Sequence, residues 1–266
     1  MKVVLLSPEI HFHAPLVLRT LFSQLIPLGV EFHVFLTPKL SSAGKSWATP
    51  RNIIGVSGRR YLFLMMLMKL KYDFFRLMEK MFMRPFIKRR YLHSDEVCNE
   101  FGVRVLHLAN INSEEAKTLL REIKPELIFS VFFNQILKNE LLELPSLGCI
   151  NLHPSFLPEY RGMSPVLWML AEGAQTGGAT LHYMSEGIDE GAVLAQERFE
   201  ILPHDSFFTA YEKAALLGAK LAVELLSRSP LPPGSPQAEG GSSRGPITSE
   251  AIEALLKKRS FMRFKL

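Results

Sequence analysis

The first 36 residues alternate between strand and helix patterns, and this opening constrains the fold more than any other feature of the sequence. Residues 2–6 are a compact aliphatic run, and residues 30–36 alternate apolar and polar positions as a strand does. Between them, residues 14–26 have helical spacing. A strand, a helix and a second strand favour a parallel pair. We therefore expect an α/β fold with a Rossmann-like, mostly parallel sheet and helices on both faces. No G-x-G-x-x-G sequence follows the first strand, so a dinucleotide is not supported.

The alternation continues as far as residue 227, which we take as the end of one domain. Beyond it, a Pro/Gly/Ser-rich stretch predicts a linker, and the sequence ends in a short helix, so residues 228–266 are expected to form an extension. We predict strands at 103–106, 127–133 and 180–184, helices at 94–101, 113–123, 138–144, 207–226 and 248–258, and loop at 41–57.

Composition places the chain among folded proteins. Hydrophobic residues make up 47% and charged residues 21% of the 266 positions, which is typical of a globular domain. The two cysteines, Cys98 and Cys149, imply no disulfide framework, and a reducing cytoplasm is the expected location. The first nine residues become acidic too early for a signal peptide, and they fit a buried strand instead.

The net charge of +5 is concentrated in one segment. Residues 58–92 contain ten Lys or Arg against two acidic residues, a local charge of +8 that leaves about −3 for the rest of the chain. The same region is rich in methionine and aromatic residues. We expect residues 45–95 to be a basic helical insert that packs beside the functional site, where its cations could attract a phosphate on a substrate.

Two other interpretations of the insert remain open. Residues 59–90 could make peripheral contact with the inner membrane surface, since apolar side chains interleave with Lys and Arg. The longest uncharged run, residues 61–68, is far shorter than the ~20 residues of a membrane span. RNA binding is the less favoured interpretation, and a nucleic-acid partner is not expected.

The chemistry-bearing residues gather after two predicted strands, at 147–150 and 180–184. Asn151 and His153 are two positions apart, so in an extended chain both face the same side. Asp189 lies in a glycine-flanked loop after the strand at 180–184. An amide that polarises a carbonyl, an imidazole beside a forming oxyanion and a carboxylate that positions a proton would together suit acyl transfer.

Other candidates have simpler explanations. Ser155 lacks a G-x-S-x-G elbow, so we interpret it as a hydrogen-bonding loop residue. Cys149 fits a buried structural thiol. His11 and His13 follow the first strand and could line a substrate pocket, whereas His182 and His204 are scattered. The histidines have no metal-ligand spacing, and no metal site is proposed.

Two motifs resemble the folate-dependent formyltransferase family, which includes methionyl-tRNA, glycinamide ribonucleotide and amino-sugar formyltransferases. They are N-L-H-P-S-F-L-P-E-Y-R-G at 151–162, followed by Ser164-Pro165, and E-G-I-D-E-G-A-V-L at 186–194. The resemblance covers about residues 100–210, is weaker over 1–40 and is absent at about 45–95. It implies that 10-formyltetrahydrofolate is the co-substrate.

The resemblance also implies roles for individual residues. Asn151 would hydrogen-bond the formyl oxygen, protonated His153 would stabilise the oxyanion, and Asp189 would orient His153 or a water and help to move the proton off the amine. The folate would lie between two segments, here Phe133, Asn134, Gln135, Ile136 and Leu137 on one side and Ser185, Glu186, Gly187 and Ile188 on the other.

The acceptor-recognising parts depart from the family patterns. Residues 6–11, L-S-P-E-I-H, replace the F-x-G-T-x-x-F and G-x-G-S-N openings of the tRNA and glycinamide ribonucleotide enzymes, and the chain after residue 210 leaves little room for the extra barrel domain of the tRNA enzymes. We therefore expect a small-molecule amine as acceptor, with a nucleotide-linked amino sugar as the first hypothesis. The alternatives are transfer to methionyl-tRNA or glycinamide ribonucleotide, hydrolysis of 10-formyltetrahydrofolate, and a non-enzymatic folate-binding or membrane-peripheral protein. The oligomeric state is left open.

Overall fold

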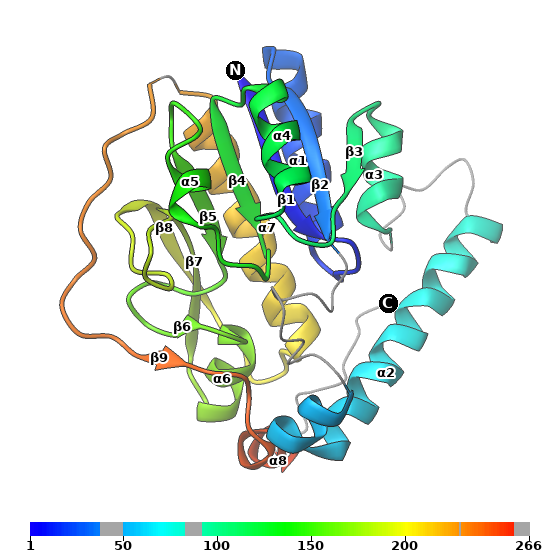
Figure 1. Ribbon diagram of the computed structural model, residues 1–266. Helices are drawn as coiled ribbons and strands as arrows, with labels where there is room; N and C mark the ends of the chain where they lie inside the picture. The colour runs from blue at the N-terminus through cyan, green and yellow to red at the C-terminus, as the bar shows by residue number, and fades with distance from the viewer. Residues whose placement is uncertain (38–49, 83–91, 229, 258–266) are drawn as a thin grey trace.

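A seven-stranded sheet organises the chain (Figure 1). The structure is a computed structural model that describes residues 1–37, 50–82, 92–228 and 230–257. The strands are β1 Lys2–Pro8, β2 Glu31–Thr37, β3 Arg104–His107, β4 Leu127–Val131, β5 Cys149–His153, β7 Thr176–Tyr183 and β8 Val193–Glu200. Their order in the sheet is β3-β2-β1-β4-β5-β7-β8. The strands from β3 to β5 are parallel, whereas β7 and β8 are antiparallel to their neighbours. The expected mostly parallel α/β sheet is confirmed.

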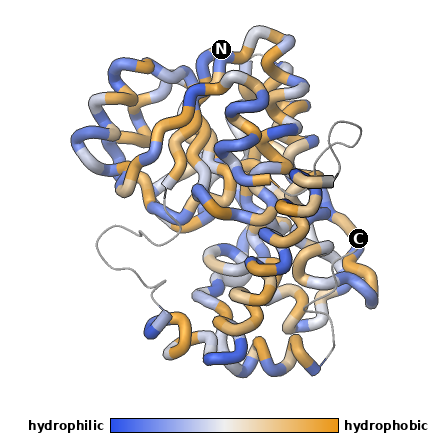
Figure 2. The backbone as a smooth tube through the Cα atoms, turned by 90° about the vertical axis from the view of Figure 1, so that its right-hand side faces the viewer, coloured by the Kyte–Doolittle hydropathy of each residue, from blue (hydrophilic) through white to orange (hydrophobic). Residues whose placement is uncertain are grey.

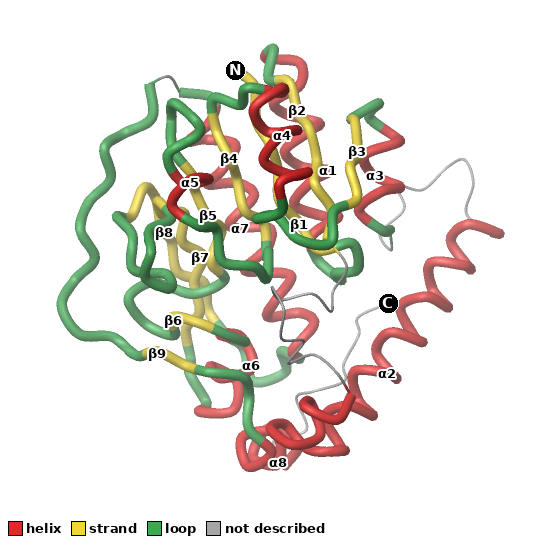
Figure 3. Tube along the Cα trace, viewed as in Figure 1, coloured by secondary structure: helices red, strands yellow, loops and turns green. Residues whose placement is uncertain are grey.

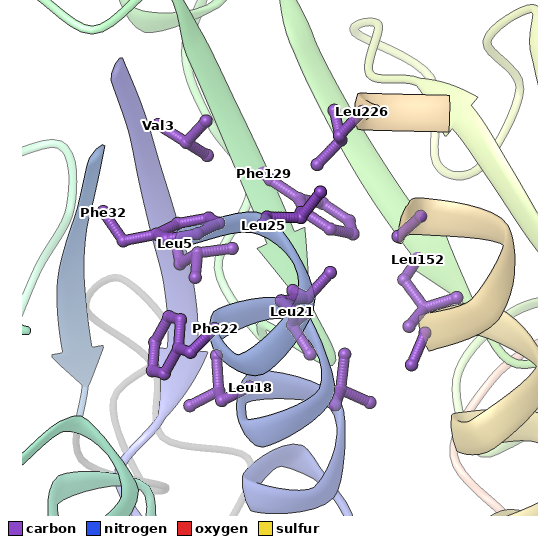
Figure 4. Close-up of a cluster of buried hydrophobic side chains, with 14 of the residues drawn as sticks. Val3, Leu5, Leu18, Leu21, Phe22, Leu25, Phe32, Phe129, Leu152 and Leu226 are labelled. Carbon is purple, nitrogen blue, oxygen red and sulfur yellow. The ribbon is translucent and has the colours of Figure 1, made fainter. Parts of the chain in front are cut away.

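Helices cover both faces of this sheet (Figure 3). Side chains of β1 alternate between the two sides: Val3 and Leu5 join a cluster with α1 and α7, and Val4 and Leu6 join a second cluster with α4 and α5. Figure 4 shows Leu18, Leu21 and Phe22 of α1 packed against the first face. The helices are α1 Ala14–Leu25, the 3₁₀ turn η1 Ile26–Leu28, α2 Pro50–Phe82, α3 Ser94–Glu100, α4 Glu114–Ile123, α5 Asn139–Leu142, α6 Pro165–Glu172, α7 Phe207–Leu226 and α8 Ser249–Lys257.

Hydroxyl caps begin two of these helices. The Ser113 hydroxyl accepts a hydrogen bond from the Ala116 N–H (3.2 Å) at the start of α4. Ser206 caps α7 by accepting from the Thr209 N–H (3.2 Å). Each cap satisfies a backbone donor that a first helical turn leaves unpaired. The long helix α7 therefore starts at a fixed position, and its residue Tyr211 reaches the site described below.

A third apolar cluster lies beside the sheet rather than on it. Met68 and Tyr72 of α2 are buried against α6, α8 and the first turn of α7. Residues 50–82 of the predicted insert are thus helical, as predicted, and are joined to the fold by their own small core, whereas residues 45–49 and 83–91 lie outside the described residues. Hydrophobic and hydrophilic residues alternate along the helices in Figure 2, as expected of helices with one buried face. No helix within the described ranges is long and apolar enough to span a bilayer.

Several sequence-based element predictions were wrong in detail. Residues 50–57, predicted as loop, begin α2, where the Ser57 hydroxyl donates to the Ile247 carbonyl (2.6 Å) and tertiary packing outweighs weak local propensity. Strand β7 begins at Thr176, four residues before the predicted start. The sequence analysis also missed α6, β8 and the short pair β6 Arg161–Gly162 with β9 Ser243–Arg244. Half-exposed edge strands such as β8 carry polar residues that hide their pattern.

The segment predicted as a linker is bound along much of its length. We call residues 230–248 the strap; it runs down the outer side of the sheet to α8 (Figure 1). Val193 and Ser235 form an isolated antiparallel bridge, and β9 pairs with β6. The Arg161 N–H donates to the Ser242 carbonyl, and the Met163 N–H donates to the Arg244 carbonyl, both at 2.8 Å. The strap is therefore attached to the loop that follows β5.

Candidate active site

Two of the predicted catalytic residues occupy the carboxyl end of β5. Asn151 and His153 lie two positions apart on this strand and both line one cavity. The register places Ser130 of β4 and His182 of β7 on either side of Asn151. In an α/β sheet this edge is where ligands bind, because loops there diverge and leave a crevice.

A hydrogen bond from Ser130 fixes the orientation of the Asn151 amide. The Ser130 hydroxyl donates to Asn151 Oδ1 at 2.7 Å, which leaves Nδ2 directed toward Asp189 and His182. Nδ2 lies 3.3 Å from Asp189 Oδ1 and 3.2 Å from His182 Nε2. The amide therefore presents N–H donors, rather than its oxygen, to the site.

Asp189 lies at the centre of the cluster. Its Oδ2 accepts from the Gly162 N–H at 2.8 Å and lies 3.4 Å from His153 Nδ1, and its Oδ1 lies 3.5 Å from His182 Nε2. Burial by itself would raise the pKa of this carboxyl, but the two imidazoles and the Gly162 N–H lower it to about 2. Asp189 is therefore ionised throughout the physiological range. Its backbone has φ 55°, a left-handed conformation that costs a non-glycine residue energy.

His153 is enclosed by protein acceptors. Its side chain is 4% exposed, and Nε2 donates to the Tyr160 carbonyl at 2.9 Å while Nδ1 faces Asp189. Burial lowers the pKa of His153, and Asp189 and the Tyr160 carbonyl oppose this effect. Because both nitrogens face oxygen acceptors, the doubly protonated ring satisfies both, whereas the neutral ring turns a lone pair toward the carboxylate. In the protonated imidazole, the Nε2–H would thus face the Tyr160 carbonyl and the Nδ1–H would face the Asp189 carboxylate.

The loop after β5 supplies the Tyr160 carbonyl and the Gly162 N–H. Inside it the Ser155 hydroxyl donates to the Glu159 carbonyl at 2.7 Å, so Ser155 is a loop hydrogen-bonding residue, as expected. Gly162 has φ 92°, and a Cβ there would lie 2.4 Å from the Arg244 carbonyl oxygen of the strap. Only glycine fits this position without moving the strap.

A cavity of about 720 Å³ opens beside these residues, within the usual range of small-molecule sites. Both segments that the sequence assigned to folate line it, with Ile136 and Ile188 exposed at its rim (65% and 56%). The Gln135 side chain points back into the protein: its amide donates to the Ala109 carbonyl and accepts from the Ile111 N–H, both at 2.9 Å. The lining comprises Ser130, Phe132–Leu137, Asn151–Pro154, Gly162–Pro165, His182, Met184–Asp189, Tyr211 and Ser243–Gly245.

The sequence analysis missed several members of this site. His182 was treated as scattered, yet it lies directly opposite Asn151, and its Nδ1 donates to the Tyr183 carbonyl at 2.8 Å. Ser130 was detectable as a lone polar residue in an apolar strand, whereas Tyr211 and strap residues Ser243–Gly245 gave no such signal.

Three further expectations concern residues around the cavity. His11 and His13 are absent from the described lining; they stack behind it, His11 on Phe132 and His13 on Tyr211, each with ring centroids 4.8 Å apart. Burial raises the pKa of the Cys149 thiol to about 12, as expected of a structural cysteine. Over the described ranges, no group of three or more His, Cys, Asp or Glu side chains is arranged to hold a metal ion.

The described part of α2 does not contribute to the cavity wall. Its residues between 50 and 82 are absent from the lining, and the helix packs against α6 and α8 instead. The prediction that the cations of the insert attract a substrate phosphate therefore receives no support from those of α2, and its basic residues between 83 and 91 lie outside the described residues. Arg244 of the strap is the arginine found in the described lining.

Residues 91–226 match the family model described as formyl transferase. The chain belongs to this family. A methionyl-tRNA formyltransferase of Kosmotoga olearia is 39% identical over 133 residues, 50% of this chain and 43% of that protein. The chain thus spans less than half the length of this formyltransferase relative.

Solved formyltransferase structures share the fold. A sugar N-formyltransferase from Shewanella sp. FDAARGOS_354 has a TM-score of 0.59 and 19% identity, over 99% of this chain and 90% of that one. An N-formyltransferase from Helicobacter canadensis, in complex with folinic acid and dTDP-3-aminofucose, has a TM-score of 0.55 and 17% identity, over 92% and 71% of the two chains. At these identities the likeness concerns the fold alone.

Proposed function

We propose that this formyltransferase-family protein transfers the formyl group of 10-formyltetrahydrofolate to the amine of a small-molecule acceptor. The observation that carries the proposal is the convergence of Asn151, His153 and Asp189 on a cavity lined by residues 133–137 and 185–188. Membership of the family supports the same chemistry.

Asn151 and His153 stabilise negative charge on the formyl oxygen. The Ser130 hydroxyl holds the Asn151 amide at the cavity wall with its Nδ2 toward Asp189 and His182, so a donor is already oriented before the charge develops. Both nitrogens of His153 are engaged by Asp189 and the Tyr160 carbonyl. Protonated His153 therefore contributes its positive charge from behind, while Asn151 makes the direct hydrogen bond.

The Asp189–His153 pair also assists the transfer of the proton that the attacking amine loses. The attacking amine forms a bond to the formyl carbon and must lose a proton, and the folate nitrogen that leaves must gain one. Ionised Asp189 stabilises the proton already on His153, so the imidazole keeps its positive charge, and the same carboxylate helps to move the amine proton to the folate nitrogen. No net proton is consumed.

The cavity is compatible with a folate. Its rim isoleucines, Ile136 and Ile188, lie in the two predicted folate-binding segments and offer exposed apolar surface for a flat ring. The backbone of residues 133–137 and 185–188 would hold the pterin from both sides. Bound there, 10-formyltetrahydrofolate would supply an activated formyl group.

For the acceptor we propose an amino sugar linked to a nucleotide. Ser243, Arg244 and Gly245 of the strap form part of the cavity wall, and Arg244 is a cation that matches a phosphate group. The Helicobacter canadensis protein of the same fold was solved with dTDP-3-aminofucose, which makes such acceptors the first to assay. Methionyl-tRNA is the second candidate, because the Kosmotoga olearia relative is a methionyl-tRNA formyltransferase.

The test measures release of tetrahydrofolate with a panel of amines: nucleotide-linked amino sugars, glycinamide ribonucleotide and methionyl-tRNA. Turnover that needs an amine supports transfer, whereas amine-independent turnover would establish a hydrolase. Asn151→Ala, His153→Ala and Asp189→Asn should each lower kcat by ~10²–10³. Exposed His204→Ala is the matched control, and wild-type rates in all three site variants would refute the assignment.

A further inference from the structure

Helix α2 carries an apolar stripe on the side opposite its buried residues. Phe63, Met66, Leu70, Phe74, Leu77 and Met81 recur every three or four residues, and each is between 51% and 68% exposed. This spacing places all six on one face. The buried residues Met68 and Tyr72 lie on the other face, against α6 and α8. The helix is therefore apolar on both sides, but only one side is packed within the described part of the chain.

The stripe is long and continuous. Gly58, with φ 84°, breaks the helix direction, and the segment from Arg59 onward runs as a single helix to its end at Phe82. In Figure 1 this helix extends outward from the sheet. Exposed apolar side chains that occur singly are ordinary, whereas a row of six along one face marks an interaction surface.

Basic side chains flank the stripe. Residues 59–82 hold six basic residues and two acidic ones, a charge of +4. Glu96 of α3 pairs with Arg76 and Lys80, and Glu253 of α8 pairs with Arg60, so the surface with these two partners remains at +2. An apolar face bordered by Lys and Arg is the pattern of helices that lie in the plane of a membrane interface.

We propose that α2 docks this protein on an anionic bilayer surface, with the stripe inserted among the lipid headgroups and the flanking cations facing lipid phosphates. Charge decides between this occupant and a second copy of the chain. Two α2 helices paired along their stripes would bring two positive surfaces together, which is unfavourable. An anionic lipid surface instead attracts the same cations. The proposal is independent of the acyl-transfer chemistry, since the described part of α2 does not line the cavity.

Co-sedimentation of the full chain with vesicles tests the proposal. Wild type should bind vesicles of mixed phosphatidylglycerol and phosphatidylcholine, bind pure phosphatidylcholine several-fold more weakly, and lose binding as salt increases. The variant Leu70→Glu/Phe74→Glu removes two exposed stripe residues and should lower the partition coefficient by about a hundredfold, because each inserted side chain contributes about tenfold.

Leu28→Glu is the matched control. Leu28 is a 64% exposed leucine of η1, outside α2, and its replacement should leave vesicle binding unchanged. Sedimentation velocity and a melting curve on each variant report self-association and folding. Failure of wild type to bind anionic vesicles, or equal binding by the double variant, would overturn the proposal. A dimer that dissociates in the double variant, without vesicle binding, would assign the stripe to a second copy.

Discussion

Gln237 offers a way to perturb the candidate site from outside it. Its Nε2 donates to the carbonyls of Asp189 (2.7 Å) and Gly191 (2.9 Å), and its Oε1 accepts from Arg161 Nε (3.0 Å) and Nη2 (2.6 Å). One side chain thus joins the strap to both loops that meet at Asp189. We expect it to be a positioning residue that holds the left-handed backbone of Asp189.

The expected loss of stability in Gln237→Ala follows from these hydrogen bonds. Gln237→Ala loses two neutral hydrogen bonds of about 1 kcal/mol each and a charge-assisted pair to Arg161, and water regains part of this because the site is half-exposed. The net cost should be about 2 kcal/mol in the free energy of unfolding. If about 1.4 kcal/mol of it falls on the geometry of Asp189, kcat drops about tenfold.

Gln237→Glu separates positioning from stability. Glutamate has the same shape and retains acceptors for Arg161, but it cannot donate to the Asp189 and Gly191 carbonyls. We expect the charged pair with Arg161 to offset only part of the two lost hydrogen bonds, so stability should lie between wild type and Gln237→Ala. The lower kcat should remain and the pH profile should change, as measured by denaturant unfolding and steady-state kinetics. Exposed Gln175→Ala serves as control. A Gln237→Glu enzyme with wild-type kcat and pH profile would refute the positioning role.

Three further outcomes are expected. Folinic acid at 100 times its Kd should stabilise the native state by about 2.7 kcal/mol, seen as a higher Tm, and no shift would contradict a folate site. Because the pKa values of His153 and Asp189 are lowered, the unfolded chain binds more protons than the folded one. As the pH decreases, the free energy of unfolding should therefore decrease below about pH 6.5 through His153, and again from about pH 4 toward 2 through Asp189. His153→Gln should remove the first of these decreases, as measured by denaturant unfolding at several pH values. Gly162→Ala should reduce both stability and kcat, because its Cβ would meet the Arg244 carbonyl at 2.4 Å, and unchanged values would show that the strap moves freely.

The parallel part of the fold was predictable because each element is local and strongly patterned. The aliphatic runs at β1 and β4 are buried on both faces, so their composition alone indicates strands. The antiparallel edge was not predictable in the same way. β8 is half-exposed along its length, and its Gln, Glu and Arg residues disguise the alternation that defines a strand.

Some residues of the candidate site could likewise be predicted from local sequence, and others could not. Asn151 and His153 are two residues apart on one strand, so their common direction follows from strand geometry, and the glycines around Asp189 mark its loop. His182 joins the site through the register of an antiparallel pair, which depends on the placement of β7 against β5. No local pattern in the sequence contains that register, so His182 could be found only from the structure.

The strap shows what composition alone does not reveal about the C-terminal region. Proline, glycine and serine predict the absence of helix and strand, and residues 230–242 are indeed irregular, but irregular backbone can still be fixed by side chains and single bridges. The family match ends at residue 226, before the strap begins. Yet the Arg244 carbonyl of the strap leaves no room for a Cβ at Gly162 of the loop after β5, and Gln237 of the strap holds Asp189. Ser243, Arg244 and Gly245 of the same strap also line the cavity. The segment that completes the cavity wall is therefore the one that fixes the carboxylate, so a change in the strap that alters acceptor choice should alter kcat as well.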